Sequence, residues 1–252
     1  MIHTEDRRIY AVGDIHGHLE KLDTTLDQIH ADLMARPHQA PIVIFLGDYI
    51  DRGPDSRGVL DRLVSLSDET FDYRFLYGNH DDYMFRFVED PPSWHNRRYH
   101  WLSFEIGGIK TLESYGIPGA VEADAIELAP LFFNAVPRAH RDFLSALPRT
   151  IQIGSYLFVH AGIRPGIAIT DQDPYDLIWI RDEFLNHTGD FGAIVVHGHT
   201  PVWEVENHGN RIAVDTGAAF GGELSCVVLE NSAQAVLTPS GPAPLRPITQ
   251  IA

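Results

Sequence analysis

Short apolar runs that stop at a polar residue recur along the chain and give the clearest structural signal in the sequence. In the first third these runs are Ile9 to Val12, Ile42 to Leu46 and Tyr73 to Tyr77. Their length and their β-branched and aromatic content predict strands, and runs that are apolar on both faces are typical of buried parallel strands. The pattern therefore predicts an α/β fold.

Three further runs repeat the pattern in the second half of the chain, namely Tyr156 to Val159, Ala193 to Val196 and Arg211 to Val214. Each of the six runs is followed by Asp, Asn or His close to a glycine. Ligands of α/β proteins gather outside the carboxyl ends of the strands. We therefore expect the polar ends of the six runs to converge on one site.

Helices are expected between these strands. An amphipathic helix is predicted after the first run, because apolar residues there alternate spacings of three and four. These residues are Leu19, Leu22, Leu26, Ile29 and Leu33. A second helix is expected over Gly53 to Ser67, before the third run, so the chain opens with repeated strand-helix units.

The alternation of strands and helices is interrupted at about residues 82–148, where short helical patterns predict a small helical cap insertion. Its aromatic side chains are expected to form a hydrophobic core that joins the insertion to the sheet. They are Trp94, Trp101, Phe104, Phe132 and Phe133. Prolines and glycine in residues 239–252 predict an irregular tail, and we expect a single domain over residues 1–252.

Composition narrows the classes of partner. The 35 acidic against 19 basic residues give a formal charge of −16, which opposes binding to nucleic acid. No apolar run approaches the roughly 20 residues that cross a bilayer, and the start of the chain lacks the apolar stretch of a signal peptide. We therefore expect a cytoplasmic protein without a membrane partner. The one cysteine, Cys226, is expected to be a buried thiol.

Six residues at the predicted strand ends supply ligand atoms suited to two divalent metal ions. They are Asp14, His16, Asp48, Asn79, His160 and His199. With Asp48 bridging, Asp14 and His16 complete the protein ligands of one ion, and the other three residues complete those of the second. Mixed oxygen and nitrogen ligands favour Mn²⁺, and suit Fe or Zn²⁺, over Ca²⁺ or an all-oxygen Mg²⁺ site.

Two such ions activate water at neutral pH and clamp the attacking and leaving oxygens during displacement at phosphorus. The transition state spreads negative charge over three equatorial oxygens, so a guanidinium is the expected additional partner. Arg52 lies four residues past Asp48 and is suited to this role. The sequence thus predicts a metal-dependent phosphoesterase that hydrolyses phosphate monoesters.

Five motifs resemble, in their order along the chain, the signatures of the phosphoprotein phosphatase family. They are Gly13-Asp14-Ile15-His16-Gly17, Gly47-Asp48-Tyr49-Ile50-Asp51-Arg52-Gly53, Gly78-Asn79-His80, His160-Ala161-Gly162 and Gly198-His199-Thr200. The resemblance spans about residues 9–220. It implies a four-layer α/β/β/α metallophosphoesterase sandwich, a two-metal centre held by the six ligands, and direct attack of the activated water without a phosphoenzyme intermediate.

The same resemblance implies roles for four more residues. His80 is similar to the family's general acid, with Asp51 orienting its ring, and a carboxylate partner favours the charged imidazole that protonates a leaving oxygen. Arg52 matches a phosphate-binding arginine of the family. Arg181 resembles a second such arginine of bacterial members, although a surface ion pair with Asp182 or Glu183 is the alternative.

Other polar residues near the motifs have weaker signals. His197 and His95 have no motif role, so we expect neither to be a ligand. Arg164 follows His160 closely, but its spacing alone is not specific. Asp215 resembles a position that orients a ligand histidine. Asp81 stands where most protein phosphatases have Glu, which affects fine geometry and not metal binding.

The first functional interpretation is a protein phosphatase of the bacterial serine/threonine type, acting on phosphoserine, phosphothreonine or phosphotyrosine in a phosphoprotein or phosphopeptide. The alternative within the family is a symmetrical diadenosine-tetraphosphate hydrolase. Those hydrolases usually replace the aspartate of the second motif with a neutral residue, whereas Asp51 is intact here. No obligate regulatory subunit is expected, because the chain lacks the longer carboxyl-terminal elements that recruit one in eukaryotic members.

Two further classes stay open. An inactive phosphoprotein-binding module would have lost a ligand or the acid, and none is missing from the motifs. A two-metal phosphodiesterase would share the same ligands, and turnover of bis-p-nitrophenyl phosphate against the monoester distinguishes it.

Overall fold

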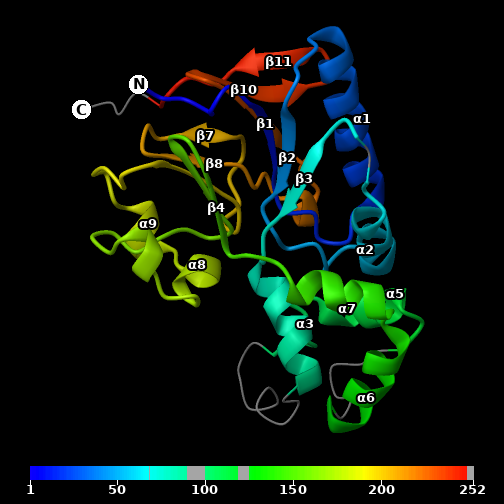
Figure 1. Cartoon of the computed structure of the whole chain (residues 1–252). Coiled ribbons are helices and arrows are strands. Elements are labelled where there is room, and N and C mark those ends of the chain that lie inside the picture. The colour runs from blue at the N-terminus through cyan, green and yellow to red at the C-terminus, as the bar shows by residue number, and fades with distance from the viewer. Residues whose placement is uncertain (68, 90–99, 119–124, 249–252) are drawn as a thin grey trace.

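The structure is a computed structural model that describes residues 1–67, 69–89, 100–118 and 125–248. Trp94 and His95 lie outside the described residues, as does the end of the predicted tail. Two β-sheets face each other at the centre, and helices cover the outer face of each sheet (Figure 1). This confirms the α/β fold and the four-layer α/β/β/α arrangement.

The first sheet has six strands in the order β11-β10-β9-β1-β2-β3. They are β1 (Arg8–Val12), β2 (Pro41–Phe45), β3 (Asp72–Phe75), β9 (Cys226–Glu230), β10 (Ala233–Thr238) and β11 (Gly241–Pro244). β1, β2 and β3 are parallel, whereas β9, β10 and β11 add an antiparallel edge. Every residue of β1 and β2 is buried, as expected for central strands.

The second sheet has five strands in the order β4-β5-β6-β8-β7. They are β4 (Thr150–Ile153), β5 (Tyr156–Val159), β6 (Ile194–His197), β7 (Glu206–Asn207) and β8 (Arg211–Ala213). β5, β6 and β8 are parallel, and β4 and β7 close the two edges as antiparallel strands. All three parallel strands come from apolar runs that the sequence pattern identified.

Ten helical segments are described. They are α1 (Leu19–Ala35), α2 (Ser56–Val64), α3 (Asn79–Glu89), α5 (Gly108–Ser114), α6 (Ala125–Ala135), α7 (Arg138–Ser145), α8 (Asp176–Trp179), α9 (Asp182–Leu185), and the short 3₁₀ segments η1 (Ile169–Asp171) and η2 (Ala218–Phe220). None of the described helices has the length and apolar composition needed to cross a bilayer.

Three hydrophobic cores hold the layers together. Alternate residues of β1 point to opposite faces, so Ile9 and Ala11 pack between the two sheets while Tyr10 and Val12 pack under the helices. On the outer face of the second sheet, Leu157 and its neighbours pack against α8 and α9. The central strands of each sheet are therefore buried on both faces, which explains why they are apolar without alternation.

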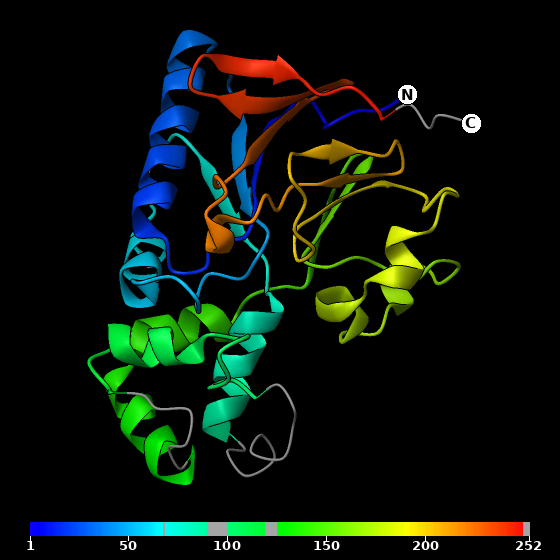
Figure 2. The same cartoon turned by 180° about the vertical axis from the view of Figure 1, so that it is seen from behind.

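Helices α3, α5, α6 and α7 form a group beyond one end of the strands (Figure 2), where α5 and α7 contact α2 of the first sheet. Trp101 and Phe132 are buried and in ring contact, with centroids 5.2 Å apart, as expected for a core of the insertion. Phe104 and Phe133 do not join that core and are exposed. The expectation was wrong for these two, because amphipathic elements also present apolar side chains to solvent.

Two boundaries predicted from the sequence need correction. The tail predicted as irregular over residues 239–252 contains β11, whose prolines are tolerated because the strand lies at the edge of the sheet. The helix predicted from Gly53 begins only at Ser56. Asp55 caps it by accepting a 2.7 Å hydrogen bond from the Gly58 amide, and the residues before the cap form a loop of the site.

Candidate metal centre

The six predicted metal ligands lie in loops at the carboxyl ends of parallel strands from both sheets. Asp14 and His16 follow β1, Asp48 follows β2, and Asn79 begins α3 after β3. His160 follows β5 and His199 follows β6. All six are buried. The ligand-bearing ends of the two sheets therefore lie at one common edge. The fold brings Asp14 and His199 together there, although they are 185 positions apart in the sequence.

Several of these residues have strained backbones. His16, Asp48 and His199 have positive φ angles of 48°, 54° and 65°, in a region that residues with a side chain rarely occupy. Asp51 and Arg52 do so as well, at 73° and 66°. Strain of this kind costs about 1–3 kcal/mol per residue and persists where the surrounding structure over-determines the conformation, as at functional sites.

Two glycines allow the loops to approach closely. A Cβ atom on Gly198 would lie 2.1 Å from Oδ1 of Asp14, and one on Gly78 would lie 2.3 Å from the amide nitrogen of Asp48. Any side chain at either position would displace a predicted ligand. The glycines of these motifs are therefore required by packing at the site.

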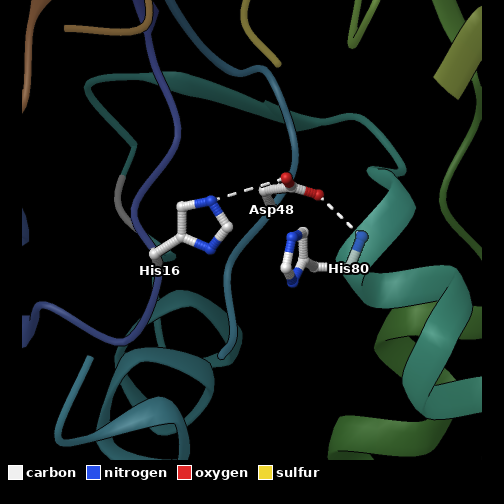
Figure 3. Close-up of side chains that lie close together, drawn as sticks. All are labelled: His16, Asp48 and His80. Carbon is white, nitrogen blue, oxygen red and sulfur yellow. Dashed lines mark hydrogen bonds and ion pairs between the residues drawn. The ribbon is translucent and has the colours of Figure 1, made fainter. Parts of the chain in front are cut away.

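Asp48 lies at the centre of the cluster and faces ligands from both sheets. Its Oδ2 is 3.6 Å from Nε2 of His16, and its Oδ1 is 3.4 Å from Nε2 of His160. The backbone amide of His80 donates to Oδ1 at 2.9 Å, and Figure 3 shows the His16 and His80 rings next to each other beside the carboxylate. This central position fits the bridging role predicted for Asp48.

The second group of ligands meets at the side-chain amide of Asn79. Its Oδ1 is 2.9 Å from Nε2 of His160 and 2.8 Å from Nδ1 of His199. Asp14 is tied to the same group, because its Oδ2 accepts a 3.0 Å hydrogen bond from the backbone amide of His199. Among the described residues, two clusters have donor atoms close enough together to hold a metal ion, His16-Asp48-His80 and Asp48-His160-His199, and both contain Asp48.

Backbone carbonyls fix the orientation of two imidazoles. Nδ1 of His16 donates to the Ile50 carbonyl at 2.9 Å, and Nδ1 of His160 donates to the Leu46 carbonyl at 2.9 Å. Each ring then directs its Nε2 into the cluster. Ligand histidines commonly have such partners, which set the tautomer and increase the basicity of the ligating nitrogen.

The buried carboxylates and unpaired ligand atoms of the cluster are suited to binding cations. Burial opposes ionisation of Asp48, but His160, His80 and His16 hold its pKa well below the usual range. Burial and the nearby Asp215 raise the pKa of Asp14 well above its usual value. Oδ1 of Asp14 and Nε2 of His199 are buried without a hydrogen-bond partner. Buried ligand atoms left unpaired beside crowded carboxylates fit divalent metal ions.

His80 and Asp51 form a direct contact, with Nδ1 of the imidazole 2.7 Å from Oδ2 of the carboxylate. Asp51 also accepts hydrogen bonds from Nε1 of Trp101 and, at 2.6 Å, from Oγ1 of Thr111. Burial raises the pKa of Asp51, and these donors act in the opposite direction. The pKa of His80 is lowered to about 3, mainly by burial, although the Asp48 carboxylate acts in the opposite direction.

The two predicted phosphate-binding arginines lie beside the cluster. Nη1 of Arg52 donates to Nε2 of His16 at 3.0 Å, and its buried Nε has no partner. Arg181 is partly exposed, and its Nη1 donates to Oγ1 of Thr200 at 3.1 Å. The alternative of a surface ion pair with Asp182 or Glu183 finds no support, since no such pair is seen among the described residues and Glu183 lies instead near Arg164.

Asp81 holds the loop that carries Asp48. Its Oδ2 accepts hydrogen bonds from the amides of Asp48 and Gly78, at 3.0 and 2.9 Å, and its Oδ1 accepts one from Tyr49 at 3.2 Å. Burial raises the pKa of this carboxyl, but three backbone donors favour the carboxylate. Asp81 therefore positions the central ligand through its backbone.

Some polar residues near the motifs lie outside the cluster. Arg164 is held by Asp176, with Nε 2.6 Å from Oδ2. His197 is buried against Phe184 and Arg211. Oδ1 of Asp215 accepts from the Gly217 amide at 2.9 Å, so its contribution to the ligands is electrostatic and no contact with a ligand histidine is seen.

Sequence reasoning missed two residues that contact Asp51. Trp101 was expected only in the hydrophobic core of the insertion, and it also donates to the Asp51 carboxylate. Thr111 donates to the same carboxylate and contacts Ser56. Neither lies in a motif, and both come from the insertion, 50 and 60 positions from Asp51. No local signal in the sequence could have found them.

Comparisons with known proteins agree on the general class. A family model described as calcineurin-like phosphoesterase matches residues 7–231. A relative from Oceanobacillus iheyensis, named bis(5'-nucleosyl)-tetraphosphatase PrpE [asymmetrical], is 27% identical over 240 residues, covering 86% of this chain and 87% of its own. The protein of that name from Bacillus subtilis is 27% identical over 224 residues, covering 85% and 87%.

Solved structures support the fold. A protein described as a candidate diadenosine tetraphosphatase superposes with a TM-score of 0.61 at 22% identity, over 97% of this chain and 96% of its own. The cold-active protein-tyrosine phosphatase of a Shewanella species superposes with a TM-score of 0.63 at 17% identity, over 97% and 83%. At these identities the similarity supports the fold and does not distinguish between substrates.

We predict that Asp48→Asn weakens the binding of both metal ions, because the central carboxylate supplies the charge shared by the two ligand groups. Metal affinity should fall by at least about 100-fold, more than the loss typical of an outer partner of a ligand. Elemental analysis of the purified variant measures this, with Asp72→Asn on the surface as control. Two tightly bound ions per chain in Asp48→Asn would remove Asp48 from the bridging role.

We also predict that Asp81→Asn destabilises the fold. An amide in place of the carboxylate turns an N–H₂ donor toward a backbone N–H, which leaves both donors unpaired at a cost of about 1–3 kcal/mol. Urea unfolding of the metal-free proteins measures the loss, again against Asp72→Asn. A free energy of unfolding equal to that of the wild type would show that the backbone donors do not depend on this carboxylate.

Proposed function

We propose that this chain, which belongs to the calcineurin-like phosphoesterase family, hydrolyses dinucleoside tetraphosphates into unequal products, a nucleoside monophosphate and a nucleoside triphosphate. The observation on which the proposal rests is the similarity, over about 86% of the chain, to relatives named asymmetrical bis(5'-nucleosyl)-tetraphosphatases. The metal-dependent phosphoesterase class follows from the family itself, and the substrate is the proposed part.

This proposal replaces protein phosphatase as the first interpretation. The intact Asp51 distinguishes the chain from symmetrical diadenosine-tetraphosphate hydrolases, but that argument does not address hydrolases of the asymmetrical type. The relatives are named as hydrolases of the asymmetrical type. The symmetrical diadenosine-tetraphosphate hydrolase, the alternative given above, acts on the same class of substrate as the proposed enzyme but differs from it in the position of cleavage.

The ligand groups around Asp48 would hold two divalent cations, with Asp14 and His16 on one side and Asn79, His160 and His199 on the other. Such ions supply an activated water at neutral pH and neutralise charge on the phosphate oxygens. The choice among Mn²⁺, Fe and Zn²⁺ is part of the proposal, and the mixed oxygen and nitrogen ligands favour Mn²⁺.

Arg52 and Arg181 are proposed to bind the phosphate chain. A tetraphosphate presents several anionic groups, and two guanidiniums beside one cluster can engage neighbouring phosphates. A cation ligated by Nε2 of His16 would compete with the hydrogen bond that Arg52 donates to that atom. Arg52 is then free to turn its donors, including the unpaired Nε, toward phosphate oxygens.

His80 is proposed to deliver a proton to the leaving oxygen, and Asp51 to hold the ring and favour its charged form. In the absence of substrate, burial and the nearby cationic side chains keep His80 neutral, since together they lower its pKa to about 3. An anionic phosphate bound beside the ring adds negative charge and raises that pKa, so protonation is coupled to substrate binding. The hydrogen bonds from Trp101 and Thr111 hold the Asp51 side chain in place and favour its carboxylate form against the effect of burial.

Protein phosphatase activity is the second candidate, and the contact between His80 and Asp51 is the observation that favours it. An alkoxide is a poor leaving group, so hydrolysis of phosphoserine depends on a proton donor more than hydrolysis of a phosphoanhydride does. A site with a complete acid pair is therefore suited to phosphopeptides as well.

The substrate proposal is tested by product analysis. Metal-replete protein is incubated with diadenosine tetraphosphate and, in parallel, with a panel of phosphoserine, phosphothreonine and phosphotyrosine peptides. We expect AMP and ATP in equal amounts, with a kcat/KM for the dinucleotide at least about tenfold above that for any peptide. ADP as the sole product would indicate symmetrical cleavage, and a higher kcat/KM for a peptide would restore the protein phosphatase interpretation.

The acid role is tested by comparing leaving groups. His80→Asn should lose about 10²–10⁴ in the rate of phenyl phosphate hydrolysis and less with p-nitrophenyl phosphate, whose leaving group departs more readily without a proton. Asp51→Asn should show the same asymmetry in milder form, because an amide holds the ring but stabilises imidazolium less well.

The measurement is single-turnover hydrolysis of both esters by metal-replete proteins across pH. Metal content is measured in parallel and should be unchanged in both variants. Equal losses on the two esters would argue against leaving-group protonation, and loss of an ion from His80→Asn would make His80 a ligand.

A further inference from the structure

Two exposed aromatic rings line a groove close to the metal centre. Trp203 is fully exposed and Phe220 is 67% exposed. Both line a cavity of about 840 Å³ whose other walls are largely apolar, formed by residues of the loops after β6 and β8 and by residues near β10 and β11. A groove of this size accommodates a group as large as a nucleoside.

The groove lies close to the proposed phosphate site. The guanidinium carbon of Arg52 lies 5.1 Å from the centre of the Phe220 ring, in a cation–π contact. Pro201, at the groove wall, directly follows Thr200, whose hydroxyl accepts from Arg181. A molecule whose phosphates are held by these arginines therefore has one end at the entrance of the groove.

The loop that carries Phe220 is held in its conformation. Nζ of Lys21, on α1, donates to the carbonyls of Ala218 and Gly222 at 2.8 and 2.6 Å. The Gly217 carbonyl accepts from the amides of Phe220 and Gly222, at 2.8 and 3.0 Å. A ring held in place before binding loses little conformational entropy when a ligand stacks on it.

The chemistry of the groove favours a neutral planar ligand. Its lining includes the carboxylates of Glu204 and Glu223, which repel phosphate but accept hydrogen bonds from an exocyclic amino group. Thr216 and Ser225 also line the groove, and their hydroxyls are hydrogen-bonded to each other. Aromatic rings with nearby acceptors suit a nucleobase, since every base offers a face for stacking.

We propose that the groove between Trp203 and Phe220 binds one nucleobase of the substrate, while Arg52 and Arg181 bind the adjoining phosphates. The identity of the substrate rests on the proposed tetraphosphatase function. Binding of a base in the groove does not depend on the position of cleavage, so the two can be tested separately. Phe220 stacks on the base, and Lys21 positions the loop of Phe220.

The test compares two competitors that share a triphosphate and differ by a nucleoside. ATP and inorganic tripolyphosphate are assayed as inhibitors of p-nitrophenyl phosphate hydrolysis by metal-replete protein, with Mn²⁺ in excess of both. Each variant then yields a ratio of the two inhibition constants. The variants are Phe220→Ala, Trp203→Ala and the conservative Phe220→Tyr, with Phe133→Ala as a matched exposed aromatic on the insertion.

We expect the wild type to prefer ATP over tripolyphosphate by at least about tenfold, the range of one stacked base. Phe220→Ala should lower this preference roughly tenfold and Trp203→Ala should lower it less, while Phe220→Tyr and Phe133→Ala should retain it. The same variants are assayed for hydrolysis of diadenosine tetraphosphate.

The outcomes separate the two proposals. A wild type without a preference for ATP, or a preference that survives Phe220→Ala, overturns the nucleobase site even if the tetraphosphate is hydrolysed. A preference that Phe220→Ala removes, in a protein that does not hydrolyse the tetraphosphate, supports the nucleobase site and overturns the proposed function. If Phe220→Ala loses phosphopeptide turnover while its ATP preference is unchanged, the groove binds a peptide and the nucleobase site is overturned.

Discussion

The buried carboxylate of Asp48 is the group on which the rest of the site depends. It faces His16 from one sheet and His160 from the other, and its loop is held by two hydrogen bonds to Asp81. A charge in this position is tolerated because imidazoles and backbone donors surround it. Its position also fixes the distance between the two ligand groups, and hence the geometry in which a phosphate can bind.

The site is costly to the fold, and the layered core offsets that cost. Positive φ angles at Asp48, Asp51 and Arg52, and buried carboxylates with raised pKa values at Asp14 and Asp215, all oppose folding. Three hydrophobic cores hold the strands that end at these loops. Strain and charge are therefore concentrated at one edge of an otherwise apolar sandwich, where bound cations and substrate relieve part of them.

The metal motifs do not by themselves distinguish a protein phosphatase from a tetraphosphatase, because both reactions require the same activated water and the same charge neutralisation. The difference between substrates lies in what surrounds the motifs. Here the surroundings include Arg181 at the edge of the cluster and the groove of Trp203 and Phe220, neither of which belongs to the metal ligands. Substrate choice is therefore expected to depend on loops outside the metal ligands.

The sequence by itself determined the α/β class, the strands that end in ligands, and the six residues that meet at one edge, because glycine-flanked polar ends of buried strands must gather there. It could not determine that β11 extends the first sheet, since an edge strand with prolines has no apolar pattern. Nor could it determine that Trp101 and Thr111 hold Asp51, or that Phe220 lies over Arg52. Those contacts join residues at least 50 positions apart, and only the packing of the insertion and of the second sheet against the first decides them.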